Sequence, residues 1–369
     1  MQPNTEKIVL VFQGGGALGA YQAGAYEELQ RAGLEPDWVA GISIGAVNAA
    51  LIAGNPPERR VPQLKAFWDM VSSGLQAKPL PGGEIARMLF NETSAGFVTL
   101  YGIPGFFMPR MLMPFMHPPG TTDALSFYDT SPLRTTLGDL VDFEHLNDDA
   151  SPRLSLGAVN VRTGNFTYFD THDMTVTPDH VMASGALPPG FPPVQIDGEA
   201  YWDGGLVSNT PLQYVLDDGG LQEDLCVFQF DLFPARGALP RTIMDVTQRE
   251  KDIRYSSRTR MNTDRFRELQ TLRQMIRRLV SKLPPELSAD PDVARLKALS
   301  SDVAVTIVHL IHRSASYLTQ SKDYEFSRAS IDEHWLAGRN DVRRTLRHPS
   351  WRSRGRPDDG VLVLDLTND

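Results

Sequence analysis

The sequence contains very little cysteine and no long apolar run. Cys226 is the single cysteine among 369 residues, which excludes an internal disulfide and fits a reducing compartment, although a cysteine-poor exported protein would have the same composition. No uninterrupted apolar segment is long enough to span a bilayer. The N-terminal residues lack the basic start, apolar stretch and small-residue cleavage site of a secretory signal. We therefore expect a cytoplasmic protein, with peripheral contact to a membrane left open.

The sequence also has fewer basic residues than acidic residues. The 36 Lys and Arg residues are outnumbered by 45 Asp and Glu residues, which gives a formal net charge of -9. This balance argues against wholesale binding of nucleic acid, although it does not exclude a local basic surface. No cluster of His, Cys and carboxylates suggests a catalytic metal, and no EF-hand spacing occurs. We expect no nucleic-acid partner, and nothing in the sequence calls for a metal or a cofactor.

The first part of the chain alternates strand and helix patterns. Residues 8–12 (IVLVF) are apolar and β-branched without alternation, which is typical of a fully buried strand. A helical pattern follows and ends near Gly33, residues 38–42 have the pattern of a second short strand, and residues 46–53 form a helix of small residues. This order predicts an α/β fold with a mainly parallel sheet covered by helices.

The regular alternation of strand and helix patterns is lost between residues 56 and 122. Residues 102–120 combine Phe, Met and Pro without a clean period. This composition favours an irregular packed insertion, and the alternative is a mobile flap whose soft side chains adapt to an apolar ligand. The sequence does not decide whether residues 78–122 move as a lid.

The second half of the chain adds further strands and a charged helical tail. Residues 154–160 and 166–169 have the pattern of a hairpin, and residues 224–233 that of another buried strand. Residues 265–282 predict a helix that packs its apolar face on the domain or, alternatively, rests on anionic lipid. Its expected apolar face consists of Phe266, Leu269, Leu272, Ile276, Leu279 and Leu283.

A G-x-S-x-G motif lies at a predicted strand-to-helix junction. Gly41, Ser43 and Gly45 form it, directly after the second strand. In this context the motif makes a tight turn that exposes the serine Oγ, and the glycines relieve close contacts around it. The positive end of the following helix favours negative charge that develops at the turn. Ser43 is therefore a candidate nucleophile, and the alternative is a serine that only caps the helix.

Three consecutive glycines at residues 14–16 follow the first predicted strand. Their N–H groups are unobstructed and well suited to receive an oxyanion. Together with Gly19 they also fit the dinucleotide pattern G-x-G-x-x-G. That function would require an acidic residue at the far end of the second strand. Because Asp37 precedes that strand and Ser43 occupies its far end, nucleotide binding is a minor alternative.

A nucleophilic hydroxyl needs a base, and one carboxylate stands out. Asp203 follows Tyr201 and Trp202 and precedes two glycines, so we expect it where a buried strand ends in a turn. Apolar neighbours raise the pKa of a carboxyl group towards neutrality, as a general base requires. The alternative is an aspartate that stabilises the turn through its own backbone. None of the eight histidines has a local catalytic signature.

The motifs taken in order resemble the signature blocks of the patatin-like phospholipases. The glycine block, GISIG, ASGALPPGFPPV and DGGLVSNTPL carry this resemblance over residues 8–215. It implies a three-layer α/β/α sandwich and a serine–aspartate dyad, without histidine, that hydrolyses lipid acyl esters through an acyl-enzyme. The implied nucleophile is Ser43 and the implied base is Asp203. The resemblance further assigns the oxyanion hole to Gly14, Gly15 and Gly16, and the supporting motif positions to Gly19, Gly41, Ile44, Gly45, Gly204 and Gly205.

The resemblance also divides the chain. We expect residues 8–215 to form the acyl hydrolase domain, and residues 216–369 to form a C-terminal extension that partly completes the sheet and is largely helical. Residues 321–338 resemble the extension of a bacterial subgroup of the family. Within them we expect packing and hydrogen-bonding roles, rather than catalysis, for Tyr324, Glu325, Arg328 and His334.

Two positions depart from the family pattern. Many members carry Arg or Lys where Leu18 stands, which weakens recognition of an anionic phosphate headgroup and leaves neutral esters open. Gln13 stands where plant members have an aspartate. The expected function is a serine acyl hydrolase acting on a lipid or another apolar acyl ester, and the alternative is a non-catalytic lipid- or partner-binding protein on a hydrolase scaffold. Phospholipid, lysophospholipid, monoacylglycerol and storage polyester all remain open as substrates, as does the oligomeric state.

Overall fold

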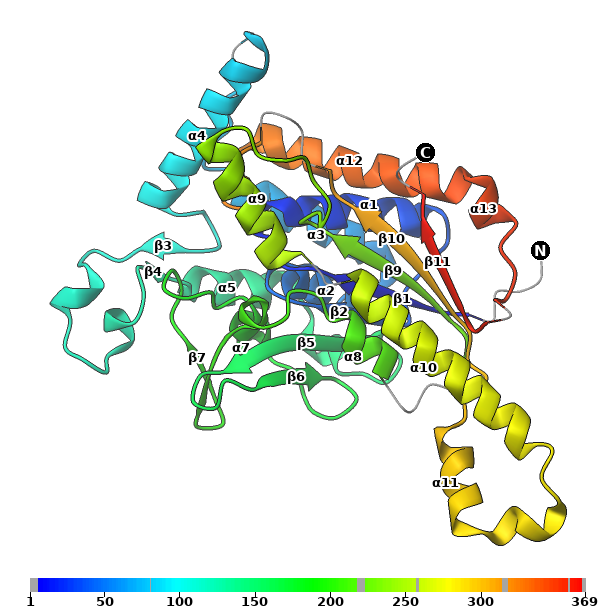
Figure 1. Cartoon of the computed structure of the whole chain (residues 1–369). Helices are drawn as coiled ribbons and strands as arrows, with labels where there is room; N and C mark the ends of the chain where they lie inside the picture. Colours follow the sequence, from blue (N-terminus) through cyan, green and yellow to red (C-terminus); the bar gives the residue numbers. More distant parts are fainter. Residues whose placement is uncertain are drawn as a thin grey trace.

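A computed structural model describes residues 6–79, 81–217, 223–256, 259–313, 318–357 and 359–366, with backbone only for residues 259–263 and 288–289. Its centre is a mixed sheet of nine described strands in the order β11-β10-β9-β1-β2-β5-β8-β7, with β6 paired to β5 (Figure 1). The strands of this sheet are β1 (Lys7–Phe12), β2 (Trp38–Gly41), β5 (Arg153–Asn160), β6 (Phe166–Asp170), β7 (Val194–Ile196), β8 (Glu199–Asp203), β9 (Leu225–Asp231), β10 (Val305–Ile311) and β11 (Val361–Asp365). A separate antiparallel pair is formed by β3 (Met108–Pro109) and β4 (Tyr128–Asp129).

The sheet is parallel from β11 to β5 and antiparallel where β6, β8 and β7 join it. The described helices are α1 (Ala20–Arg31), α2 (Ile44–Ala53), α3 (Pro57–Val71), α4 (Gly83–Tyr101), α5 (Ser131–Leu140), α6 (Phe143–Leu146), α7 (Pro178–Ser184), α8 (Leu212–Asp217), α9 (Ile243–Tyr255), α10 (Thr259–Val280), α11 (Pro291–Leu299), α12 (Arg328–Arg347) and α13 (Pro349–Arg352). Short 3₁₀ helices are η1 (Gly16–Gly19), η2 (Pro114–Met116), η3 (Thr122–Ala124), η4 (Gly204–Leu206) and η5 (Pro285–Ala289).

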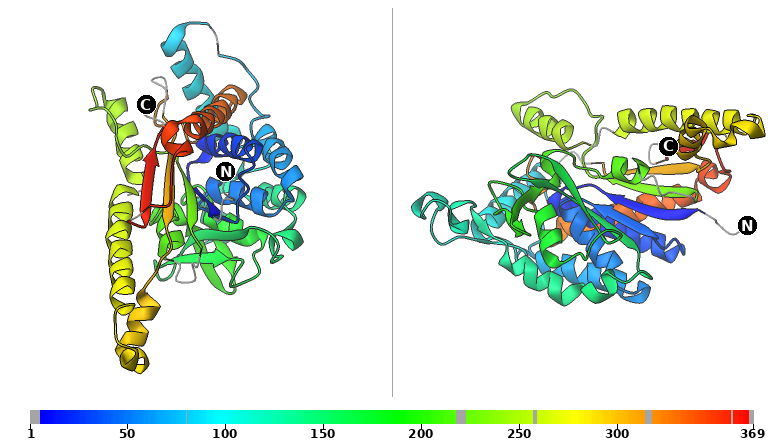
Figure 2. Two further views of the ribbon diagram at one scale, coloured as in Figure 1. Left: turned by 90° about the vertical axis from the view of Figure 1, so that its right-hand side faces the viewer. Right: turned by 90° about the horizontal axis from the view of Figure 1, so that it is seen from below.

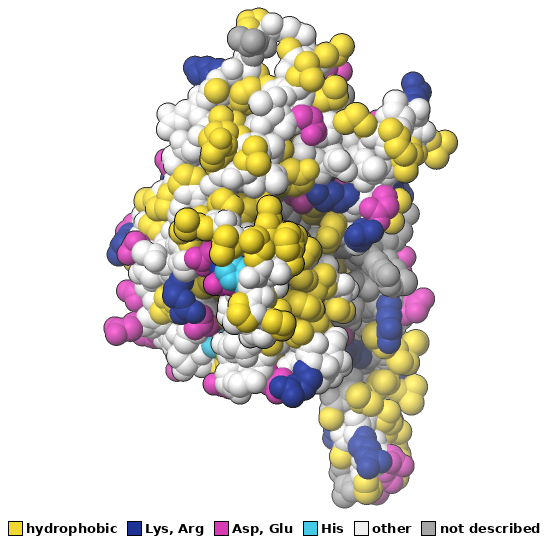
Figure 3. Space-filling model, turned by 90° about the vertical axis from the view of Figure 1, so that its left-hand side faces the viewer, with side chains coloured by type: hydrophobic (Ala, Val, Ile, Leu, Met, Phe, Trp, Pro, Cys, Tyr) yellow, Lys and Arg dark blue, Asp and Glu magenta, His cyan; other side chains and the backbone are white. Residues whose placement is uncertain are grey.

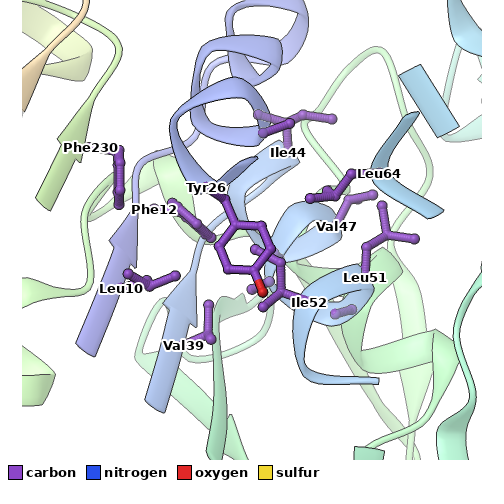
Figure 4. Close-up of a cluster of buried hydrophobic side chains, with 14 of the residues drawn as sticks. Leu10, Phe12, Tyr26, Val39, Ile44, Val47, Leu51, Ile52, Leu64 and Phe230 are labelled. Atoms are coloured by element: carbon purple, nitrogen blue, oxygen red, sulfur yellow. The ribbon is translucent and has the colours of Figure 1, made fainter. Parts of the chain in front are cut away.

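Helices cover both faces of the sheet, as the strand and helix patterns predict. Alternate side chains of β1 enter different cores, because successive residues of a strand point to opposite faces. Leu10 and Phe12 pack with α1, α2, α3 and α12, as the close-up in Figure 4 shows for part of this cluster. Val9 and Val11 pack with α8 and with Phe266 of α10 on the other face. The three-layer α/β/α arrangement is therefore confirmed.

The C-terminal half of the chain contributes both helices and sheet. Strands β9, β10 and β11 extend the parallel sheet beyond β1, while α12 crosses α1 on the larger face (Figures 1 and 2). At opposite ends of the molecule, α4 and the α10–α11 pair project from the body. In the described part of the chain, every helix is too short or too polar to cross a membrane.

The expectation of a packed insertion at residues 102–120 is partly wrong. Ile103, Phe106 and Phe107 are buried, but the large side chains that follow are exposed, with Met111 fully exposed and Phe115 82% exposed. Residues upstream, which lacked a clear pattern, form the regular helices α3 and α4. Four prolines between residues 109 and 119 limit backbone pairing in this segment, so it does not fold back onto a core.

The expected apolar face of α10 is also partly wrong. Phe266 is buried, but Leu272 and Leu279 are exposed, and Gln270 and Gln274 occupy buried positions instead. The Gln270 amide donates a hydrogen bond to the carbonyl of Val303, and both glutamines lie against Gly360. Phe266 packs on the apolar sheet face, whereas Gln270 and Gln274 lie beside the residues that precede β10 and β11, where the Val303 carbonyl has a polar partner.

Candidate active site

The glycine block forms a loop at the carboxyl end of β1. Its last glycine, Gly16, has φ of 53°, and a Cβ there would lie 1.9 Å from the carbonyl oxygen of Asp323. Within the described residues, the amides of Gly15 and Gly16 have no hydrogen-bond partner, whereas Gly14 donates to Asn209. Two adjacent N–H groups are thus available to a ligand.

The G-x-S-x-G motif forms a sharp turn between β2 and α2. Ser43 has φ of 56° and ψ of -125°, a conformation that non-glycine residues rarely adopt. A Cβ on Gly41 would lie 2.3 Å from the carbonyl oxygen of Gly45, and one on Gly45 would lie 2.6 Å from that of Phe12. The close contacts explain both flanking glycines. Because α2 begins at Ile44, its positive end lies at the turn.

Asp203 ends strand β8 and is 2% exposed. Burial raises the pKa of its carboxyl group, and hydrogen bonds from the Ser43 hydroxyl and the Gly205 amide, the latter 2.7 Å long, counteract this increase. The resulting pKa is about 7. The carboxylate is therefore poised to gain or lose a proton near neutral pH, as the sequence interpretation requires.

Sheet register brings these remote residues together. Gly41 of β2 is paired with Leu156 of β5, and Ala158 of β5 is paired with Asp203 of β8. Ser43 therefore follows β2 and Asp203 ends β8, the two strands that flank β5 at this point. The side chains of Ser43 and Asp203 meet above β5. Gly204 lies against the carbonyl of Gly157, which keeps the turn after β8 close to β5.

An apolar cavity of about 390 Å³ opens over this pair, within the size range of ligand pockets. Its walls come from both halves of the chain. Apart from Ser43, Asp203 and the glycine loop, they include Val47, Val98, Phe106, Phe107, Tyr128, Leu133, Leu187, Phe191, Phe233, Tyr255, Tyr324 and Phe326. The described lining contains two carboxylates, Asp203 and Asp323, and no Lys, Arg or His.

None of the eight histidines, all of which lie in the described part of the chain, lines this cavity. His180 belongs to the capping box of α7 with Thr177, and His312 lies 3.1 Å from His334 in a buried pair. His309 lies on β10. The described residues also contain no group of three or more His, Cys, Asp or Glu that could hold a metal ion.

A hydrogen-bonded network that the sequence analysis missed holds the glycine loop. The Gln13 side chain is fully buried, accepts hydrogen bonds from the amides of Leu232 and Phe233, and donates to Thr210 and to the carbonyl of Tyr255. Asn209 donates to the carbonyl of Gly14 at 3.0 Å and also to that of Tyr255. The departure at Gln13 was noted from sequence, but its partners are too distant in the chain to be inferred.

One of the tail residues singled out from sequence lines the cavity, and the others have hydrogen-bonding or ion-pair partners elsewhere. Tyr324 lines the cavity, Glu325 accepts a hydrogen bond from Ser94, and Arg328 pairs with Asp69. Asp37, considered for ribose binding, accepts a hydrogen bond from the Ile8 amide near the start of β1, at the opposite end of the strand from the glycine loop. This position argues against the dinucleotide alternative.

Comparisons with known proteins give the family. A sequence model described as patatin-like phospholipase matches residues 10–216, and one described as patatin phospholipase matches residues 253–358. None of the curated proteins matches the chain. Among solved structures, the chain is similar to VipD from Legionella pneumophila, with 14% identity, a TM-score of 0.34, and coverage of 92% of this chain and 67% of that one. Since the first family model spans more than half of the 369 residues, the chain belongs to the patatin-like phospholipase family and is a lipid acyl hydrolase.

Proposed function

We propose that Ser43 and Asp203 form a catalytic dyad that hydrolyses carboxylic esters of lipids through an acyl-enzyme. The observation that carries this proposal is the hydrogen bond between the Ser43 hydroxyl and a buried carboxylate with a pKa of about 7. A carboxylate with this proton affinity is an efficient base near neutral pH. The strained turn at Ser43 and the apolar cavity above it support the same function.

The proposed reaction has two halves. Asp203 accepts the Ser43 proton as Oγ attacks the ester carbonyl, and the amides of Gly15 and Gly16 receive the negative charge on the carbonyl oxygen. Protonated Asp203 then donates its proton to the departing alcohol. In the second half, Asp203 accepts a proton from water as that water attacks the acyl-enzyme, and the fatty acid leaves as Oγ regains its proton.

We further propose that the ester is uncharged around the scissile bond. The described lining of the cavity is mostly apolar and offers a phosphate group no cation. Leu18, at the position where many family members carry a basic residue, is fully buried in the core. A phosphate beside Asp323 would lose its hydration without gaining a positive partner. A monoacylglycerol-like ester fits these walls better than an ester whose phosphate lies beside the reacting carbonyl.

The test of the dyad is substitution followed by active-site labelling. Ser43→Ala is expected to abolish both hydrolysis of a nitrophenyl decanoate and labelling by a fluorophosphonate, while Asp203→Asn should lower kcat by about 100-fold or more. Ser73→Ala is the matched control, because the exposed Ser73 hydroxyl bonds only the carbonyl of Met70. A folded Ser43→Ala protein as active as the parent contradicts the proposal.

The substrate class is tested on lipids that share one acyl chain. Turnover of monooleoylglycerol is expected to exceed that of oleoyl lysophosphatidic acid by roughly tenfold or more, because only the second substrate brings a phosphate into a cavity whose described lining has no cation. Equal turnover of both lipids would contradict the proposed preference and leave the dyad untouched.

We also propose that the protein meets lipid surfaces through an apolar rim beside the cavity. The rim consists of exposed side chains of α4 and of residues 108–127: Ile85, Leu89, Phe97, Leu100, Tyr101, Met108, Met111, Leu112, Met113, Phe115, Met116, Leu125 and Phe127. Figure 3 shows hydrophobic side chains gathered on this side of the molecule. Val98 of α4 and Tyr128, which directly follows residues 108–127, line the cavity, so the rim leads directly to the site.

Charge distribution favours an uncharged lipid surface as the partner of the rim. Between residues 85 and 127 the charged residues are Arg87, Glu92, Arg110 and Asp123, and Arg87 is paired with Glu333. Arg110 is paired with Asp123, and Glu92 accepts hydrogen bonds from Thr319 and Ser321. Contact through the rim therefore depends on burial of apolar side chains and not on anionic lipid.

A further inference from the structure

Residues 318–327, which we call the strap, pass over the glycine loop from the C-terminal half of the chain. The carbonyl of Asp323 accepts a hydrogen bond of 2.8 Å from the Ala17 amide. Asp323, Tyr324 and Phe326 of the strap also line the cavity. The strap thus occupies one amide of the loop and leaves those of Gly15 and Gly16 without a partner among the described residues.

Two Lys-Asp dipeptides hold the strap to α9. Lys322 Nζ lies 2.6 Å from Asp252 Oδ1, and Lys251 Nζ lies 2.5 Å from Asp323 Oδ1. Each dipeptide therefore supplies the cation of one pair and the anion of the other. We call this reciprocal double ion pair the clamp. It lies where α9 passes the end of the sheet at which α12 begins (Figure 1).

The two pairs of the clamp differ in environment. The Lys322 side chain is fully buried, and its ammonium group lies 5.4 Å from the centre of the Phe233 ring. Removing one partner of a buried pair leaves an uncompensated charge, which strongly destabilises a protein. The Lys251–Asp323 pair is about one-fifth exposed, and Lys251 also donates to the carbonyl of Gln320. The exposed pair can therefore be altered with less risk to folding.

Contacts of α9 continue the clamp to the other side of the glycine loop. Tyr255, near the end of α9, lines the cavity, and its carbonyl accepts hydrogen bonds from Gln13 and Asn209. Asn209 in turn donates to the carbonyl of Gly14. The loop is thus held from one side by the strap and from the other by Gln13 and Asn209, and α9 joins both sides.

We infer that the clamp is a positioning device for the oxyanion amides: Lys251, Asp252, Lys322 and Asp323 act through the strap to keep the Gly15 and Gly16 amides directed at the cavity. The inference rests on the proposed function, because the amides matter only if an oxyanion forms beside Ser43. Interactions made only in the transition state change kcat and leave substrate binding intact. A positioning role therefore predicts a selective loss of kcat.

The test weakens the exposed pair first. Lys251→Met and Asp323→Asn are each expected to lower kcat by about 10- to 100-fold with KM within about twofold of the parent, since small displacements of catalytic groups have effects of this order. The inhibition constant of a trifluoromethyl ketone with a decyl chain should increase by the same factor, because its adduct carries the oxyanion. The binding of decanoate should not change. The exchanged pair Lys251→Asp with Asp323→Lys should recover most of kcat.

Two further variants make the result decisive. The double variant Lys322→Met with Asp252→Asn removes the buried pair without leaving a lone charge, and should lower kcat similarly. Arg343→Met is the matched control, because Arg343 of α12 pairs with Glu28 of α1 at 2.9 Å, far from the strap. It should keep the parental kcat.

Folded Lys251→Met and Asp323→Asn proteins with parental kcat and an unchanged ketone inhibition constant would overturn the inference. Failure of the proposed function has a different signature, namely an active Ser43→Ala protein, so the two outcomes are read from separate variants.

Discussion

Asp203 combines burial with a position at the cavity. It is almost fully buried, yet it ends a strand at the mouth of a cavity and keeps two hydrogen-bond donors, the Ser43 hydroxyl and the Gly205 amide. Burial outweighs these donors, so its pKa lies about three units above that of an exposed aspartate. At neutral pH both protonation states are populated, as the proposed role of Asp203 as base and then acid requires.

The pH dependence of activity follows from this pKa. In the proposed mechanism the free enzyme needs ionised Asp203 to accept the Ser43 proton, so kcat/KM is expected to increase with pH and to level off above a midpoint near 7. The measurement is a kcat/KM profile between pH 5 and 9 with an uncharged nitrophenyl ester. A midpoint near 4 would show that the carboxylate is not desolvated as described.

Stability should depend on pH with the opposite sign. The pKa of Asp203 is raised in the folded state above its ordinary value of 3.8, so between about pH 4 and 7 the folded state retains a proton that the unfolded state has lost. As the pH increases through this window, Asp203 should therefore lower the free energy of unfolding by about 1.4 kcal/mol per pH unit. Asp203→Asn should lack this contribution, which urea titrations of both proteins at several pH values would reveal. Parallel slopes would contradict it.

Among the elements, the crossing of α1 and α12 ties the two halves of the chain most closely. The helices approach through two glycines: a Cβ on Gly24 would lie 2.0 Å from the carbonyl of Trp335, and one on Gly338 would lie 2.0 Å from that of Tyr21. Arg343 pairs with Glu28 along the same interface. The strap ends where α12 begins, so this crossing also fixes the position of the C-terminal end of the strap.

Gly338→Ala is expected to destabilise the protein by about 1–3 kcal/mol, because the added methyl group meets backbone that cannot move without separating the helices. Gly96→Ala in α4 is the matched control. Nothing lies within 4 Å of a Cβ at Gly96, so this change should stabilise the protein by about 0.5–1 kcal/mol. Urea unfolding of both variants gives the comparison, and equal shifts in the same direction would refute close packing at the crossing.

The whole molecule presents its apolar and basic surfaces in different places. The apolar rim borders the cavity, whereas the basic helix α10 packs with α8 over the smaller core on the other face of the sheet. Contact with a lipid surface through the rim would bring the cavity to the lipid. Contact through the basic helix α10 would bring a different side of the protein to the lipid. Contact through α10 would favour anionic lipid, whereas contact through the rim would not require it.

The double variant Met111→Ser with Phe115→Ser tests the rim. Each side chain contributes about 1.5 kcal/mol when buried in lipid, so binding to phosphatidylcholine vesicles should weaken roughly 100-fold, with little effect of salt. Hydrolysis of a soluble, short-chain nitrophenyl ester should remain at the parental rate. Leu279→Ser on α10, which is also exposed, is the matched control. Loss of binding in Leu279→Ser, or binding that requires anionic lipid, would exclude the rim as the contact surface.

Local patterns were sufficient to predict the parts of the site that a short segment builds by itself. A buried strand followed by glycines and a helix defines both the loop at Gly14 and the turn at Ser43, because the backbone geometry of such turns excludes side chains at particular positions. The alternation of strands and helices likewise predicts the parallel sheet and its two covering layers.

Contacts between distant segments could not be predicted in this way. The meeting of Ser43 with Asp203 depends on the register of β2, β5 and β8. The buried position of Gln13 depends on hydrogen-bond partners more than 190 residues away in the chain. The clamp depends on two Lys-Asp dipeptides that have no distinctive sequence pattern. The exposure of Met111 and Phe115 reversed an expectation drawn from their hydrophobicity. The composition and hydrophobic period of a segment show which of its side chains can be buried, whereas the packed fold decides which other segments contact them. For Asp203, the neighbours supplied by the packed fold set the pKa of the carboxyl group.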